Sequence, residues 1–326
     1  MISRRSFVTL GAGLTASLFA TGHSRLRPTV SSRDSAALIG PDLPVRLPAN
    51  LPVDLAADPA IDSLANKVAL SVPRGSYSPP IAGLHPDNMI LEQLALAPQS
   101  PLPPPDVILG PAQRRAFDSA LSRFRRLQNY VGYGNFNIIG WDQSLKLARN
   151  LDVVGAFTAD ELELIEELFF VDAQTLGFYG DKVVTSLSSN IASRDIVKIP
   201  RSGHFLFKGD STATYDKIRR DLGDSVILTS GIRSVVKQIY LFMNKAEKVD
   251  GNLSLASYSL APPGHSYHAV GDFDVGKKGF GHRNFSEEFA KTDEFKRLID
   301  LGYLDIRYPQ QNPFGVRYEP WHIKVV

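Results

Sequence analysis

This chain of 326 residues is organised around the segment Pro263-Gly264-His265-Ser266-Tyr267-His268-Ala269-Val270-Gly271-Asp272-Phe273-Asp274. A second segment, Tyr318-Glu319-Pro320-Trp321-His322, lies close to the C-terminal end. Together the two segments supply histidines, carboxylates and a spare glutamate. These are the residue types of a catalytic zinc site, which has three protein ligands, an open position for water and a base beside it.

Composition restricts the class of protein. Apolar residues make up 43% of the chain, which is enough to bury at least one hydrophobic core. The net charge of +2 comes from nearly balanced acidic and basic residues, so we expect no nucleic-acid partner. The chain has no cysteine, which excludes disulfides, a thiolate nucleophile and cysteine-ligated zinc. Any metal site must therefore use His, Asp and Glu.

Residues 1–22 have the pattern of an export signal. Ser3-Arg4-Arg5-Ser6-Phe7-Val8 resembles a twin-arginine motif, and the apolar segment that follows is shorter than a typical membrane span. We therefore expect a bacterial protein that is periplasmic or otherwise extracytoplasmic. If the signal is not cleaved, it would also anchor the chain to the membrane.

Two regions separate this signal from the histidine motif. Residues 23–110 are rich in Pro, Ala and Ser and predict an extended linker. Residues 111–190 predict a helical subdomain. Pro111 marks a helix start, and apolar residues follow at intervals of three or four, at Phe117, Leu121, Phe124, Leu127 and Val131. Thr158 and Glu161 form the pattern of a capping box before a second helix.

We expect residues 191–326 to form the catalytic domain. Strand-like stretches at 203–207, 225–229 and 316–326 alternate with helical patterns, so we expect an α+β fold in which a small antiparallel sheet with flanking helices carries the metal site. The strand at 225–229 runs directly into Ser230-Gly231-Ile232-Arg233-Ser234. Arg233 at the exit of a buried strand is placed either to point into a cleft or to fix a nearby carboxylate.

Four pieces of this region, in this order, resemble the D-alanyl-D-alanine carboxypeptidase family of zinc peptidases. They are Ser230-Gly231-Ile232-Arg233-Ser234 with Gln238, then Ser266-x-His268-x-x-Gly271, an aspartate shortly after it, and Glu319-x-Trp321-His322. The family is related to the D-Ala-D-Ala dipeptidases and to the zinc fold of the hedgehog signalling domain. The resemblance covers about 195–326 and leaves residues 23–190 unexplained.

The resemblance implies a role for each matching position. One zinc ion per chain would be held by His268, Asp274 and His322, and would lower the pKa of its water to about 7. Glu319 would act as the general base, and Arg233 would stabilise the developing oxyanion. Three further residues are candidate substrate contacts: Ser266, Gln238 and Tyr258.

The identity of the carboxylate ligand is open on spacing alone. The family usually has seven residues from the first histidine to the aspartate, whereas Asp274 lies six after His268. Asp272 is the alternative metal ligand, and strand parity does not separate the two, because both stand an even number of positions from His268. We favour Asp274 because apolar residues flank it on both sides. A pairing of His265 with Asp272 ranks last.

The last motif also departs from simple strand geometry. Glu319 and His322 are an odd number of positions apart and would face opposite sides of an ideal strand. Pro320 cannot donate a hydrogen bond to a neighbouring strand. We therefore expect a bend at Pro320 that turns Glu319 toward the metal.

The leading hypothesis is a secreted, monomeric zinc D,D-carboxypeptidase or D,D-endopeptidase that hydrolyses peptidoglycan stem peptides at D-Ala-D-Ala type bonds with a zinc-activated water. The alternative is a non-catalytic cell-wall-binding protein with a structural zinc, which the shortened spacing motivates and Glu319 opposes. A peptidase for ordinary L-peptides remains a third reading, because stereochemical preference depends on pocket shape.

Overall fold

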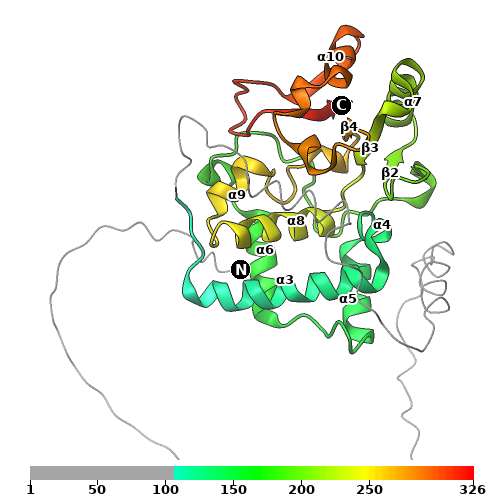
Figure 1. The fold of residues 1–326 in the computed structure, drawn as a ribbon. Helices are drawn as coiled ribbons and strands as arrows, with labels where there is room; N and C mark the ends of the chain where they lie inside the picture. Colours follow the sequence, from blue (N-terminus) through cyan, green and yellow to red (C-terminus); the bar gives the residue numbers. More distant parts are fainter. Residues whose placement is uncertain (1–105) are drawn as a thin grey trace, which may run out of the picture. The chain divides into compact units, whose positions relative to one another are not determined.

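A computed structural model describes residues 106–326, all within one compact unit (Figure 1). The predicted export signal and residues 23–105 of the predicted linker lie outside the described residues. The last residues assigned to the linker are ordered: Ile108 forms an isolated β-bridge with Asn252, and Leu109 N–H donates to Gly251 O at 3.0 Å. No helix in the described part of the chain combines the length and apolar character of a membrane span.

The predicted helices after Pro111 are present. The two predicted helices are α3 (Pro111–Val131) and α6 (Ala159–Phe170), and two helices that were not predicted, α4 (Tyr133–Phe136) and α5 (Trp141–Asn150), lie between them in the sequence. The apolar face of α3 is buried at all five predicted positions. The predicted capping box begins α6, where Thr158 Oγ1 accepts from Glu161 N–H and the Glu161 carboxylate accepts from Thr158 N–H. Sequence periodicity and capping therefore determine this part of the fold.

A four-stranded antiparallel sheet forms the second half, with strand order β3-β4-β6-β5. Its strands are β3 (Val226–Ser230), β4 (Phe273–Lys277), β5 (Asp305–Tyr308) and β6 (Glu319–Lys324). A separate two-stranded sheet pairs β1 (Ile196–Lys198) with β2 (Phe205–Phe207). The α+β class with small antiparallel sheets is confirmed.

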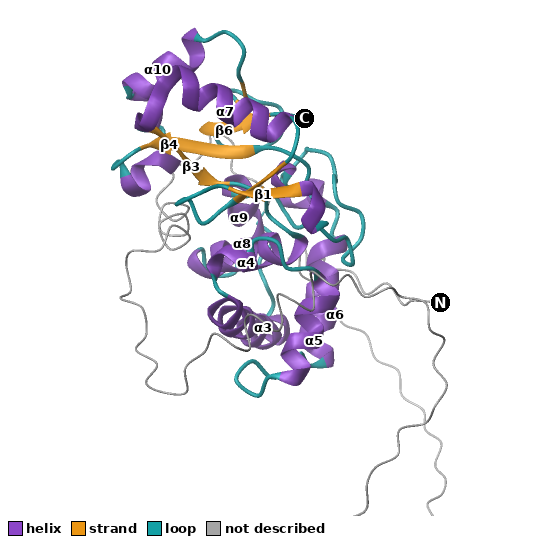
Figure 2. Cartoon of the chain, turned by 90° about the vertical axis from the view of Figure 1, so that its right-hand side faces the viewer, coloured by secondary structure: helices purple, strands orange, loops and turns teal. Residues whose placement is uncertain are grey.

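Helix α8 (Val235–Lys248) is the central element, because every residue from Val235 to Ala246 is buried. Figures 1 and 2 show α8 between α3 and the four-stranded sheet, while α7 (Asp210–Leu222) and α10 (Asp293–Asp300) lie beyond the sheet. A helix that is buried on all sides holds its neighbours in fixed positions. The loop from β3 into α8 carries Arg233.

Several shorter helices complete the fold. Helix α9 (Leu253–Ser259) was not predicted, and Asn252 caps it by accepting from Leu255 N–H at 3.0 Å. The 3₁₀ helices are η1 (Ala173–Leu176), η2 (Ser193–Asp195), η3 (Gly223–Ser225), η4 (Tyr267–Ala269), η5 (Gly281–Phe285) and η6 (Phe289–Lys291). Of these, η4 carries His268 into the interior.

Candidate metal centre

Three side chains from separate elements meet at one end of the sheet: His268 from η4, Asp274 from β4 and His322 from β6. Each offers one possible ligand atom, and the three atoms lie within 4.8 Å of one another. All three residues are buried, with at most 3% of their surface exposed. The pairing of β4 with β6 places Asp274 directly opposite His322. Sheet register therefore brings together ligands that are far apart in the sequence.

The ring of His268 has one nitrogen in use and one free. Its Nδ1 lies 2.7 Å from Gly231 O, and since a carbonyl only accepts, Nδ1 carries the hydrogen. Nε2 lies 3.2 Å from Asp274 Oδ1, yet neither atom has a hydrogen-bond partner in the described residues. Burial and the neighbouring Arg233 lower the pKa of His268, so its ring is neutral. Two buried lone pairs that face each other are the donor set a cation requires.

Gly231 makes this contact possible. A Cβ at this position would lie 2.1 Å from Phe205 O, a backbone atom that has no freedom to move aside. Only glycine fits the close approach of these two backbone segments. The carbonyl that orients His268 is therefore fixed by the packing of the β3–α8 loop on β2.

His322 faces the metal group with Nδ1, whereas His268 faces it with Nε2. Its Nε2 lies 3.1 Å from Asp272 Oδ2, whereas Nδ1 lies 3.8 Å from Asp274 Oδ1 and 3.2 Å from Glu319 Oε2. Burial opposes protonation of this ring, but the hydrogen bonds to Asp272 and Glu319 outweigh it and raise the pKa of His322 to about 9. A proton and a metal ion would compete for the Nδ1 lone pair.

Asp272, the alternative ligand, lies behind His322 and outside the three-residue group. Arg307 donates to both of its oxygens at 2.7 and 3.1 Å, and the Val325 N–H donates to Oδ1 at 2.8 Å. Burial alone would raise the pKa of Asp272, yet the hydrogen bonds from His322, Arg307 and Val325 hold it well below its usual range. A carboxylate that receives the second ring N–H of a metal-binding histidine orients that histidine.

The predicted turn of Glu319 toward His322 is present. The β5–β6 register is irregular, because Ile306 pairs with Ile323 but Tyr308 pairs with Glu319. A step of two positions along β5 therefore corresponds to a step of four along β6, over a stretch that includes Pro320. This irregularity lets Glu319 and His322 share one side of the strand despite their odd spacing.

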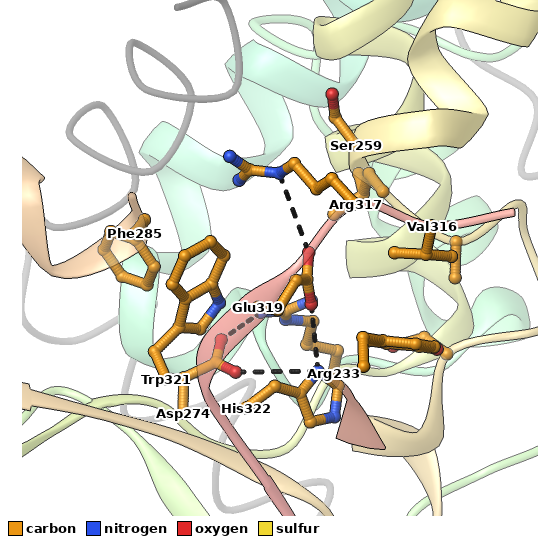
Figure 3. A pocket seen from close by; sticks show the side chains of 13 residues that line it. Arg233, Ser259, Asp274, Phe285, Val316, Arg317, Glu319, Trp321 and His322 are labelled. Carbon is orange, nitrogen blue, oxygen red and sulfur yellow. Dashed lines mark hydrogen bonds and ion pairs between the residues drawn. The ribbon is translucent and has the colours of Figure 1, made fainter. Parts of the chain in front are cut away.

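Arg233 contacts the metal group directly. Its Nη2 donates to Asp274 Oδ2 at 2.6 Å (Figure 3). Its Nε donates to Ser230 Oγ at 3.1 Å. Of the two placements left open by the sequence, Arg233 satisfies both, since it fixes a carboxylate and also lines a pocket. Burial raises the pKa of Asp274, but its interactions with His268 and Arg233 outweigh this and lower the pKa to about 2.

Of the three candidate substrate contacts, one lines the pocket and two do not. Ser266 lines it, together with Glu319, His322 and Arg233. Gln238 is not among the lining residues, although its Nε2 donates to the carbonyl of Ala261, which is one of them. Tyr258 is also absent from the lining, although its carbonyl accepts from Arg317 N–H at 3.0 Å.

Sequence reasoning missed Arg317. This arginine lines the pocket, and its Nε lies 3.9 Å from Glu319 Oε1 (Figure 3). The signal was present in the sequence, since residues two apart along an extended chain share a face and Arg317 stands two before Glu319.

Comparison with known proteins gave a family match for one part of the chain. Residues 216–326 match the family described as VanY: D-alanyl-D-alanine carboxypeptidase. The segment contains all the candidate metal ligands, Arg233, Arg317 and Glu319. It supports the family resemblance inferred from the motifs and extends to none of the first 215 residues. No curated protein matched the chain.

Solved structures gave weaker similarities. A mutant of the vancomycin-resistance D,D-pentapeptidase VanY from the VanB-type cassette, in complex with Zn(II), is 20% identical with a TM-score of 0.33 and covers 46% of this chain and 87% of that one. VanYB in complex with D-alanine-D-alanine is 21% identical with a TM-score of 0.32 and covers 44% and 86%. The D,D-dipeptidase VanXYg with a D-Ala-D-Ala phosphinate analogue is 22% identical with a TM-score of 0.35 and covers 49% and 62%.

Proposed function

We propose that this protein is a zinc-dependent D,D-peptidase that hydrolyses D-Ala-D-Ala type bonds in peptidoglycan stem peptides. The observation that carries the proposal is the buried group of His268, Asp274 and His322, which lies inside the segment that matches the D-alanyl-D-alanine carboxypeptidase family. Two lone-pair nitrogens and one carboxylate are the ligand set of a catalytic zinc with an open position.

Zinc bound here would polarise the scissile carbonyl and a water molecule. The chain's own residues would handle protons and charge. Glu319 would take one proton from the water as the water oxygen adds to the carbonyl carbon. Glu319 would then give this proton to the amine nitrogen as the C–N bond breaks. Arg233 lines the same pocket and supplies fixed positive charge beside Asp274.

An exported location agrees with this substrate. Peptidoglycan stem peptides lie outside the cytoplasm, and the twin-arginine pattern at Ser3-Arg4-Arg5-Ser6-Phe7-Val8 supports export to that compartment. We propose a periplasmic or otherwise extracytoplasmic enzyme on this basis. Fractionation of cells that carry Arg4→Lys and Arg5→Lys together tests the proposal, since loss of the pair should retain the protein in the cytoplasm.

The decisive experiment measures zinc content and D-Ala release from a muramyl pentapeptide by the full-length protein. We expect one zinc per chain and release of D-Ala. Asp274→Ala should lose both, whereas Glu319→Ala should keep the zinc and lose at least about 100-fold in kcat. An exposed carboxylate variant on α6, Glu166→Ala, is the matched control.

Each other outcome has a defined meaning. Zinc without hydrolysis of the pentapeptide or of cross-linked muropeptides would indicate a wall-binding protein with a structural metal, the reading that the short His268–Asp274 spacing motivated. Equal cleavage of L-Ala-L-Ala peptides would remove the D,D assignment. Unchanged activity in Glu319→Ala would refute the catalytic mechanism.

A further inference from the structure

Arg317 is a buried cation without an adequate partner. Only 7% of its surface is exposed, and its Nε and Nη2 atoms donate no hydrogen bond to any acceptor among residues 106–326. Its contact with Glu319, at 3.9 Å from Nε to Oε1, is longer than a hydrogen bond. The guanidinium also packs over the Trp321 ring, with its central carbon 4.8 Å from the ring centre. This packing fixes the guanidinium without satisfying its N–H groups.

Such an arrangement calls for an anion. A buried guanidinium is costly unless it is paired and hydrogen-bonded. Of the two acidic residues that line the pocket, Asp274 is bonded to Arg233, and Glu319 lies between Arg317 and His322 (Figure 3). Burial and the charge of Arg317 lower the pKa of the nearby Lys245 to about 7, so Lys245 does not supply an anion to Arg317 either. The pocket therefore has unpartnered positive charge at the end away from the metal group.

We propose that Arg317 binds the C-terminal carboxylate of the peptide substrate, which makes the enzyme a carboxypeptidase rather than an endopeptidase. The inference rests on the proposed function and specifies the substrate of the same site. An arginine with two free N–H groups suits a carboxylate, which it binds through paired hydrogen bonds.

The Glu319 carboxylate lies between Arg317 and the metal group. Glu319 Oε2 lies 3.2 Å from His322 Nδ1, and Oε1 of the same carboxylate lies 3.9 Å from Arg317 Nε. The guanidinium is thus separated from the metal group by a single side-chain carboxylate. With the scissile carbonyl beside Glu319, the side of Glu319 away from the metal group is the side on which Arg317 lies.

A purely structural role for Arg317 makes a different prediction. If it only orients Glu319, its loss should lower kcat to the same extent for every substrate. If it binds the terminal carboxylate, its loss should act on KM, and only for substrates that carry a free carboxylate. A comparison of a peptide acid with its C-terminal amide therefore separates the two roles.

The test uses the full-length protein with a peptide that ends in D-Ala-D-Ala and with the same peptide as its C-terminal amide. The unsubstituted protein should prefer the acid by roughly 10- to 100-fold in kcat/KM, mostly through KM. Arg317→Gln should remove this preference, and Arg317→Lys should retain part of it. Arg194→Gln, at a surface arginine with 87% of its side chain exposed, is the control and should keep the full preference.

A binding measurement independent of catalysis completes the test. By calorimetry, D-alanine should bind the unsubstituted protein more tightly than D-alaninamide does, and Arg317→Gln should abolish the difference. Hydrolysis without a preference for the acid would overturn the inference and leave the proposed function intact. Arg317-dependent binding of D-alanine without any hydrolysis would support the carboxylate site and reject the proposed function. An acid preference that survives in Arg317→Gln would also overturn the inference.

Discussion

Hydrogen bonds outside the metal group determine which nitrogen of each histidine is free. Gly231 O takes the Nδ1 hydrogen of His268, so Nε2 faces the site. Asp272 lies at Nε2 of His322, so there Nδ1 faces the site. The two histidines therefore use different nitrogens because their backing acceptors lie on opposite sides of the rings.

Asp272→Asn tests this orienting role. The amide keeps the shape of the carboxylate but loses its charge, so His322 Nε2–H loses its strong acceptor. We expect zinc affinity to fall by about 10- to 100-fold, while Asp274→Ala abolishes binding. Competition with a chromophoric chelator measures both affinities.

Arg307→Gln separates orientation from general stability. Arg307 bonds Asp272 at both oxygens but does not contact the metal group. It should lower the melting temperature with a smaller effect on zinc affinity than Asp272→Asn has. Equal losses of zinc affinity in the two variants would contradict a specific role for the Asp272–His322 hydrogen bond.

Residue-level prediction succeeded where a motif fixed the position and failed where side-chain direction mattered. The structure brings His268, Asp274 and His322 together in one group and places Glu319 against His322, while their catalytic and ligand roles stay predictions. Parity could not choose between Asp272 and Asp274. The apolar neighbours favoured Asp274, and its register opposite His322 places it in the three-residue group. Gln238 lies outside the pocket lining, and its contact with substrate stays a prediction. Because α8 is buried on every side, the helical position of Gln238 did not indicate which way its amide points.

At the scale of elements, local patterns predicted the long helices, and short or irregular pieces escaped. α3 and α6 carry periodic apolar faces, and α6 begins at its predicted capping box. The seven residues of α9 are too few for periodicity to identify. The bend in β6 was predicted from the chemistry of Pro320, but its form depends on pairing with β5, which lies outside the local sequence.

Glu161 links the start of α6 to α3, and we predict that Glu161→Gln destabilises the fold by about 3 kcal/mol at neutral pH. Its carboxylate accepts from Arg123 Nε at 2.8 Å and from Thr158 N–H at 3.0 Å, and only 1% of the residue is exposed. Burial raises the pKa of Glu161, but the hydrogen bonds from Arg123, Ser119 and Thr158 outweigh it, and the net pKa is lowered.

The lowered pKa of Glu161 determines how its contribution to stability changes with pH. A lowered folded-state pKa means that the stabilisation is fully present above the unfolded pKa of about 4.3 and is lost as the pH falls through the folded value. The difference in unfolding free energy between the parent and Glu161→Gln should therefore shrink in acid. Urea unfolding between pH 7 and the acid limit measures it, with the exposed Glu166→Gln as control. A difference that stays constant with pH would contradict the ionised pair.

At the scale of the whole molecule, strand order was not predictable from the sequence. β6 is the last strand in the chain but lies between β4 and β5 in the sheet. Such pairings join residues far apart in the sequence, and no local pattern encodes them. The metal group depends on this order, since the β4–β6 pairing brings Asp274 and His322 together.

Because the proposed ligands meet only in the folded chain, zinc should bind the native state and not the unfolded one, and its removal should destabilise the whole described unit. At a free zinc concentration 100-fold above Kd, this linkage contributes about 2.7 kcal/mol. For a unit of this size that corresponds to a melting temperature roughly 5–10 °C lower after chelation. Scanning calorimetry with and without EDTA, followed by zinc restoration, measures the shift. The Asp274→Ala variant should bind no zinc, so EDTA should leave its melting temperature unchanged. An equal EDTA effect in parent and variant would mean that any stabilising metal binds elsewhere and that the buried group is not a zinc site.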